Sequence, residues 1–85
     1  MTRPASNWND LDREVVRIIK NLWEEDERHL SLRALAKQIG VSHPRLSDIF
    51  KCEHGKPTLD EVVSLCLVFG KDPGTILSEA RKNVS

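Results

Sequence analysis

The side chains best suited to chemistry lie in one segment, residues 33–56. That segment carries five lysines and arginines against two acids, together with His43 and His54. Residues 10–27, in contrast, carry seven acids against three basic residues, in a chain whose formal net charge is zero. A local concentration of positive charge attracts a phosphate backbone even where the net charge is balanced. The charge pattern therefore favours nucleic acid as a partner, the alternative being chance segregation in a short chain.

The spacing of cysteine and histidine argues against a metal or catalytic centre. Cys52, His54 and His43 raise the question of a metal, but the C-x-H spacing is not the paired spacing of structural zinc sites. Cys66 falls on an apolar helical stripe, where a free cysteine belongs to the core. The sequence shows no Ser/His/Asp or Cys/His order, no paired carboxylates and no glycine-rich phosphate loop. We therefore expect neither catalysis, nor a metal, nor a cofactor.

Length and composition indicate one soluble domain. A chain of 85 residues has room for a single hydrophobic core. No apolar run approaches the ~20 residues of a membrane span, and the start of the chain, MTRPASNW, lacks the apolar stretch of a signal peptide. We expect a cytoplasmic protein without membrane contact. Its predicted parts are an N-terminal arm over residues 1–7, a folded domain over 8–82 and a tail over 83–85.

Apolar residues recur at helical spacing in five segments, without the alternation typical of strands. The predicted helices cover residues 9–27, 32–39, 43–51, 59–69 and 73–82, an all-α fold. Polar residues that serve as N-caps precede four of them: Ser31, Ser42, Thr58 and Asp72. Gly40 stands where a left-handed C-terminal stop belongs, and the fourth helix is expected to stop at Gly70.

Two of these segments carry apolar residues that we expect to face the core. The stripe in the fourth predicted helix consists of Leu59, Val62, Val63, Cys66 and Phe69. The inner side of the fifth consists of Ile76, Leu77 and Ala80.

The chain breaks one helix at Gly40 and begins another within three residues. A helix, a tight turn containing a glycine and a second helix at a steep angle form a helix-turn-helix. The turn needs a residue that accepts a positive φ, here Gly40, and a small residue where the helices approach, here Ala36. Val41 and Leu46 supply the apolar wedge between the helices. Such a unit, expected over residues 32–51, directs the start of its second helix toward base edges in the major groove.

At these residues the chain resembles the phage-repressor family, the Cro-like or XRE-type helix-turn-helix domains. The resemblance is carried by LSLRALAKQIGVSHPRLSDIF and PTLDEVVSLCLVFGKDPGTIL and covers about residues 11–80. It implies a five-helix lambda-repressor-like fold and a double-stranded DNA partner, read in the major groove, in the nucleoid of a bacterial cell.

The resemblance also implies which side chains read bases. The matching positions at the start of the second helix of the motif are His43, Pro44, Arg45, Ser47 and Asp48. Arg45 is the best candidate for a guanine contact, because its guanidinium can donate hydrogen bonds to O6 and N7 of the base at the same time. Pro44 offers apolar contact to a thymine methyl. For Asp48 two interpretations stay open: it accepts a hydrogen bond from a cytosine, or it orients Arg45.

A second set of positions is expected to contact the phosphate backbone. These residues are Arg33, Lys37, Ser42, Lys51, His54 and Lys56. Arg33 lies near the positive end of its helix, where backbone N–H groups can help to bind the phosphate. The loop KCEHGKP is about one residue longer than in many relatives, which leaves open whether His54 faces DNA or solvent.

Two functions follow from this pattern. The leading hypothesis is a sequence-specific transcriptional repressor, such as a phage immunity repressor or its DNA-binding domain, that acts by covering an operator. The alternative is a protein-interaction module on the same fold, an antitoxin or antirepressor component, which would not need the basic segment. Because the fifth helix has little apolar surface to spare, we expect a monomer or a homodimer weaker than ~10 µM, pairing on DNA.

Overall fold

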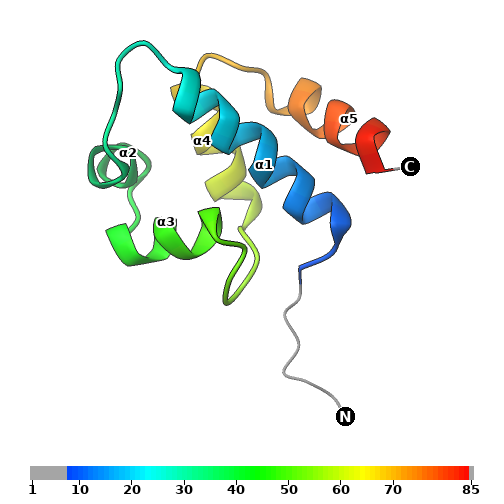
Figure 1. Cartoon of the computed structure of the whole chain (residues 1–85), viewed down its shortest axis with the longest axis horizontal. Coiled ribbons are helices and arrows are strands. Elements are labelled where there is room, and N and C mark those ends of the chain that lie inside the picture. Colours follow the sequence, from blue (N-terminus) through cyan, green and yellow to red (C-terminus); the bar gives the residue numbers. More distant parts are fainter. Residues whose placement is uncertain (1–7, 85) are drawn as a thin grey trace.

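The computed structural model describes residues 8–84, which form five α-helices and no strand (Figure 1). The helices are α1 (Asp10–Glu25), α2 (Leu32–Ile39), α3 (His43–Phe50), α4 (Leu59–Val68) and α5 (Pro73–Val84). α1 packs against α5 and α3, while α4 packs against α2 and α5. The predicted all-α architecture is confirmed.

Four helices begin at the side chains that the sequence predicts as caps. Each capping side chain accepts a hydrogen bond from the backbone N–H three residues on: Ser31, Ser42, Thr58 and Asp72. α1 begins with a capping box between Asn9 and Asp12. These bonds satisfy N–H groups that have no acceptor within the helix, so they fix where each helix starts.

The core lies where α1, α2, α3 and α4 meet. Its largest fully buried side chains are Ile19, Leu35, Leu46, Ile49, Leu65 and Cys66. The two tryptophans lie near the two ends of α1. Trp8 is buried, and the indole N–H of Trp23 donates to the carbonyl of Leu30 at 2.7 Å.

The apolar face of α4 differs from the prediction. Val62 and Cys66 are buried, but Leu59 is 76% exposed and Val63 is 38% exposed. The helix is apolar nearly all round, and packing against α2 and α5 buries the face that carries Leu65. On α5, likewise, Ile76 and Ala80 are buried while Leu77 is 37% exposed.

Other differences concern the residues at which helices end. α1 ends at Glu25, two residues before the predicted end, and α5 continues through residues 83 and 84, which we expected in a tail. The predicted arm over residues 1–7 lies outside the described residues. Within the described part of the chain, no helix combines the length and apolarity needed to span a membrane.

Candidate nucleic-acid interface

The turn between α2 and α3 has the geometry that the sequence predicts. Gly40 ends α2 in the left-handed conformation, with φ at 79°. The N–H of Val41 donates to the carbonyl of Ala36 at 3.1 Å, and Ala36 itself is buried. The oxygen of Ser42 then accepts from the N–H of Arg45 at 3.2 Å and starts α3. The two helices therefore form a helix-turn-helix.

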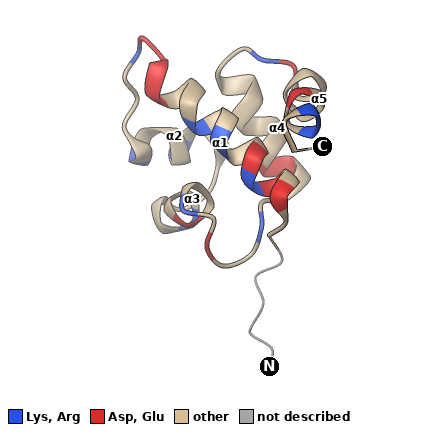
Figure 2. Ribbon diagram, turned by 45° about the vertical axis from the view of Figure 1, so that its right-hand side comes forward, with Lys and Arg blue, Asp and Glu red and all other residues tan. Residues whose placement is uncertain are grey.

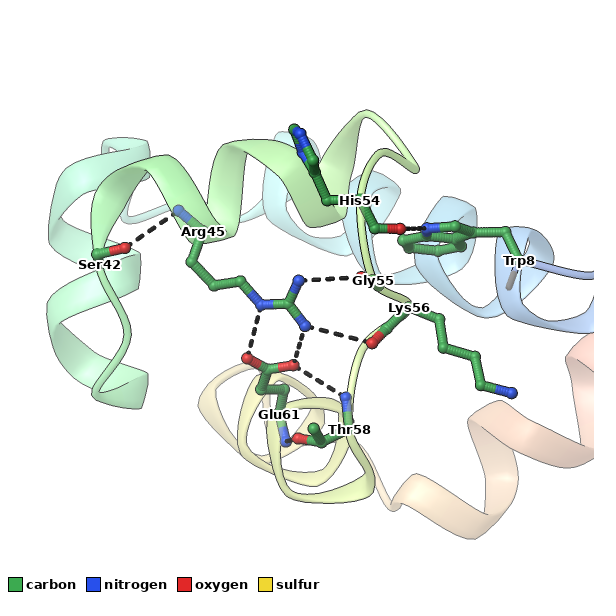
Figure 3. Close-up of polar contacts among 8 residues, drawn as sticks. All are labelled: Trp8, Ser42, Arg45, His54, Gly55, Lys56, Thr58 and Glu61. Atoms are coloured by element: carbon green, nitrogen blue, oxygen red, sulfur yellow. Dashed lines mark hydrogen bonds and ion pairs between the residues drawn. The ribbon is translucent and has the colours of Figure 1, made fainter. Parts of the chain in front are cut away.

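The first turns of α3 carry the residues that we expected to read bases. Pro44 is exposed, and His43, Ser47 and Asp48 are half-buried. Arg45 leaves the same part of the helix but extends toward the loop that follows α3 and toward α4 (Figure 3).

Arg45 is held by groups of its own chain. Its Nε and Nη2 donate to the two carboxylate oxygens of Glu61 at 3.0 and 2.7 Å. Its Nη1 donates to the carbonyl of Gly55 at 2.9 Å, and Nη2 donates to that of Lys56 at 3.3 Å. Since a guanidinium has five N–H donors, these bonds leave too few for a bidentate guanine contact. In this structure Arg45 is not available for the predicted base reading, which would require these bonds to break.

The ion pair between Arg45 and Glu61 is partly shielded from water. The side chains are 26% and 13% exposed. The hydrogen bonds from Arg45 lower the pKa of Glu61, and the hydrogen bonds to Glu61 raise the pKa of Arg45. Each partner therefore stabilises the charged form of the other, which is the behaviour of a structural ion pair.

Among the described residues no hydrogen bond joins Asp48 to Arg45. The carboxylate of Asp48 lies 2.9 Å from Nδ1 of His54, whose side chain is 72% exposed. The other interpretation of Asp48, that it accepts a hydrogen bond from a cytosine, stays a prediction. His54 thus sits at the surface beside the end of α3.

The same place holds a group of potential metal ligands. Ligand atoms of Asp48, Glu53 and His54 lie within 4.8 Å of one another. Cys52 and His43, which the sequence raised as ligands together with His54, are not in this group. All three side chains of the group lie at the surface, and Asp48 and His54 are already paired.

The residues expected to contact phosphate lie on three elements. Arg33 and Lys37 are exposed on α2, and Lys51 is exposed at the end of α3. Lys56 lies on the loop after α3, with its ammonium 3.9 Å from Asp12. Figure 2 shows the acidic residues of α1 gathered at its two ends, apart from most of these cations. The hydroxyl of Ser42 is engaged in the cap of α3.

Two residues that the sequence analysis did not assign to the interface hold the loop after α3. The indole N–H of Trp8 donates to the carbonyl of His54 at 2.8 Å. Glu61 bonds Arg45 while its Oε1 also accepts from the N–H of Thr58 at 2.9 Å. The capping-box spacing of Glu61 was visible in the sequence, and a buried indole N–H requires an acceptor. Neither feature of the sequence predicts the residue to which the side chain bonds.

Comparison with protein families agrees with this geometry. The family model for helix-turn-helix proteins matches residues 19–76, which reach from α1 into α5. Searches of curated proteins and of solved structures returned no significant match. The family match and the turn at Gly40 lead to the same conclusion: the chain belongs to the helix-turn-helix family, as a Cro/XRE-type domain with a lambda-repressor-like fold.

Proposed function

We propose that this protein is a transcriptional repressor that covers an operator, as phage immunity repressors do. Family membership already implies a transcription regulator that binds double-stranded DNA in a sequence-specific manner. The observation that carries the proposal is the start of α3, which follows the tight turn at Gly40 and leaves Pro44 exposed beside it. A helix presented in this way enters a major groove, and the bound domain blocks access to that stretch of DNA.

Base reading is assigned to the side chains at the start of α3 that the domain does not already use. His43, Pro44 and Ser47 supply one imidazole ring, one apolar surface and one hydroxyl. Asp48, although it is paired with His54, keeps a second carboxylate oxygen as an acceptor for cytosine. Arg33, Lys37 and Lys51 are exposed cations on the two helices of the motif and suit the phosphates on either side of the groove.

The test is a binding titration on mixed DNA fragments over a range of salt concentrations. A protein that neutralises several phosphates loses affinity steeply as salt rises. We expect a negative slope of log K against log salt, which becomes shallower by roughly one unit in Lys51→Ala. A slope near zero would remove the DNA-binding proposal.

The proposed dimer consists of two copies of this chain that contact each other through α4. Leu59, Val63 and Leu67 follow one another at intervals of four on one side of the helix, and Leu67 is 62% exposed. Asp60 lies at the start of this stripe and Lys71 beyond its end. In an antiparallel pair these opposite charges and the opposite helix ends meet across a two-fold axis.

α5 offers less apolar surface for a partner than α4 does. Ile76 is buried, and Val84, at the end of α5, is 39% exposed. Three side chains on one helix fall short of the ~1,200 Å² of a stable interface, so the expected dimer is still weaker than ~10 µM. Sedimentation at rising concentration should show weak association that Leu67→Glu abolishes, with Ser78→Glu, at an exposed position of α5, as a charge-matched control. Association that persists in Leu67→Glu would contradict this use of α4.

The same stripe is the one feature that favours the alternative function. An antitoxin or antirepressor component would need an apolar surface for its partner protein and no salt-dependent binding to DNA. The titration on mixed fragments separates the two functions.

A further inference from the structure

A small pocket lies where α1, α2 and α3 meet. Its volume is about 180 Å³. Apolar side chains, one hydroxyl and two lysines line it: Lys20, Trp23, Leu32, Ser47, Phe50 and Lys51. A cavity of roughly 150 Å³ accommodates one benzene ring, so the pocket has room for a single ring with a small substituent.

The apolar lining comes from side chains that the core leaves partly uncovered. Trp23 and Leu32 are half-buried and pack against the core, and the ring centroids of Trp23 and Phe50 lie 5.3 Å apart. The indole N–H of Trp23 donates to the carbonyl of Leu30, which holds the ring in place. Fixed aromatic rings favour another flat ring over a phosphate, because a phosphate has no apolar surface to bury.

The charge around the pocket favours an anion. Lys20 on α1 and Lys51 at the end of α3 both line it. Within residues 8–84 neither ammonium takes part in an ion pair, and no described acid lines the pocket. α2 begins at Leu32, so the positive end of its helix dipole lies beside the same pocket. The ligand that matches both the lining and the charge carries a ring and a negative group.

We propose that this pocket binds a small aromatic carboxylate, and that the bound acid displaces DNA. The ring packs on Trp23 and Phe50, and the carboxylate pairs with Lys20 and Lys51. Ser47 and Lys51 line the pocket and are also assigned to the DNA surface, so the acid and DNA compete for them. The displacement rests on the proposed DNA binding, whereas binding of the acid does not. The acid would act as an inducer that releases the proposed repressor.

The first experiment is an NMR titration of the isotope-labelled chain with benzoate in the absence of DNA. We expect shifts of the indole N–H of Trp23 and of the backbone amides of Leu32 and Lys51. Acetate keeps the charge without the ring, benzyl alcohol keeps the ring without the charge, and inorganic phosphate tests for a general anion site. Benzoate should bind roughly tenfold more tightly than each of the three, because it alone combines the ring with the charge.

Two outcomes of this titration would overturn the inference. Binding of phosphate as tight as that of benzoate would assign the pocket to a phosphate, with no role for its aromatic lining. Absence of shifts at Trp23, Leu32 and Lys51 would show that no ligand of this class enters the pocket.

Lys20→Gln tests the pairing with the carboxylate, since Lys20 is not among the residues assigned to DNA. Its affinity for benzoate should fall by roughly two- to fivefold, and Lys20→Arg should keep the wild-type affinity within about twofold. Arg81→Gln, at an exposed position of α5, also removes one positive charge and is the matched control. Equal affinities of Lys20→Gln and Arg81→Gln for benzoate would contradict the pairing.

The second experiment measures DNA binding with benzoate present and with acetate at the same ionic strength as the control. At a benzoate concentration tenfold above its own Kd, the apparent Kd for DNA should rise by roughly tenfold relative to acetate. An unchanged affinity for DNA would overturn the displacement. Absence of DNA binding in acetate would overturn the proposed function and the displacement with it, while the binding of benzoate alone would stand.

Discussion

The turn before α3 and the loop after it both direct parts of the proposed DNA surface, but they are built in different ways. The turn uses its own backbone, with Gly40 at a φ of 79° and a hydrogen bond from Val41 to Ala36. The loop uses side chains from elsewhere: Trp8 bonds a carbonyl 46 residues along the chain, and Arg45 bonds a carboxylate 16 residues away. The conformation of the turn therefore depends mainly on one residue, Gly40. The conformation of the loop depends on several partners at once.

The largest expected effect comes from removing the carboxylate that anchors the loop. Glu61→Ala deletes two charged hydrogen bonds to Arg45 and half of a capping box. We expect the free energy of unfolding to fall by about 2–3 kcal/mol, measured by urea denaturation. Glu24→Ala, an exposed acid on α1, should stay within about 0.5 kcal/mol of the wild type. A loss in Glu61→Ala no greater than in this control would show that the loop does not depend on the pair.

The turn should respond to a change of one backbone conformation. Gly40→Ala is expected to lower the free energy of unfolding by about 1–2 kcal/mol, because a Cβ is disfavoured in the left-handed conformation. The added Cβ would meet no other atom within 4 Å, so the effect comes from backbone strain alone. Gly55→Ala is the matched control, since it also has open space but no positive φ. Equal stability of the two variants would contradict the proposed turn.

Acidification should affect the loop more than the turn. The pKa of Glu61 is lowered below 4.5 by its bonds to Arg45, so the pair contributes stability above pH 4.5 and loses it as the pH falls through the lowered value. The turn contains no titratable group in its hydrogen bonds. The difference in stability between the wild type and Glu61→Gln should therefore be present at neutral pH and shrink in acid. A difference that does not change with pH would mean that the charge of Glu61 is not what holds Arg45.

The same contrast explains how much the sequence could predict. Caps and stops such as Ser42 and Gly40 act on neighbouring residues, so their positions could be read directly from the chain. Arg45 could not be interpreted in this way. Its type and place fit base reading, but its partner Glu61 reaches it only after α4 has packed, and one capping-box spacing does not predict that second bond.

The face of α4 was misjudged for a related reason. Val62 and Val63 are equally apolar, and only the packing of α4 against α2 and α5 decides that Val62 is buried while Val63 is 38% exposed. Helical spacing shows that a helix has an apolar side. It does not show which side is covered when nearly all sides are apolar.

The smallest expected effect concerns the acid beside the loop. Glu53→Gln should raise DNA affinity by roughly two- to threefold on every sequence alike, because one exposed negative charge beside the proposed DNA surface is removed. Glu79→Gln, on α5, should leave affinity unchanged. The gain should disappear at high salt, which screens exposed charges. A change in sequence preference in Glu53→Gln would mean that Glu53 faces a base.

The central claim is that α3 reads the DNA while Arg45 holds the loop, and the specificity of Arg45→Ala tests it most directly. The measurement compares affinities of the wild type and the variant for the preferred duplex and for mixed-sequence fragments at one salt concentration. If Arg45 acts through the loop, both affinities fall by the same factor, and their ratio stays within about twofold of the wild-type ratio. If Arg45 instead contacts a guanine, affinity for the preferred duplex alone falls, by about 1–3 kcal/mol. That result would contradict the role assigned to Arg45.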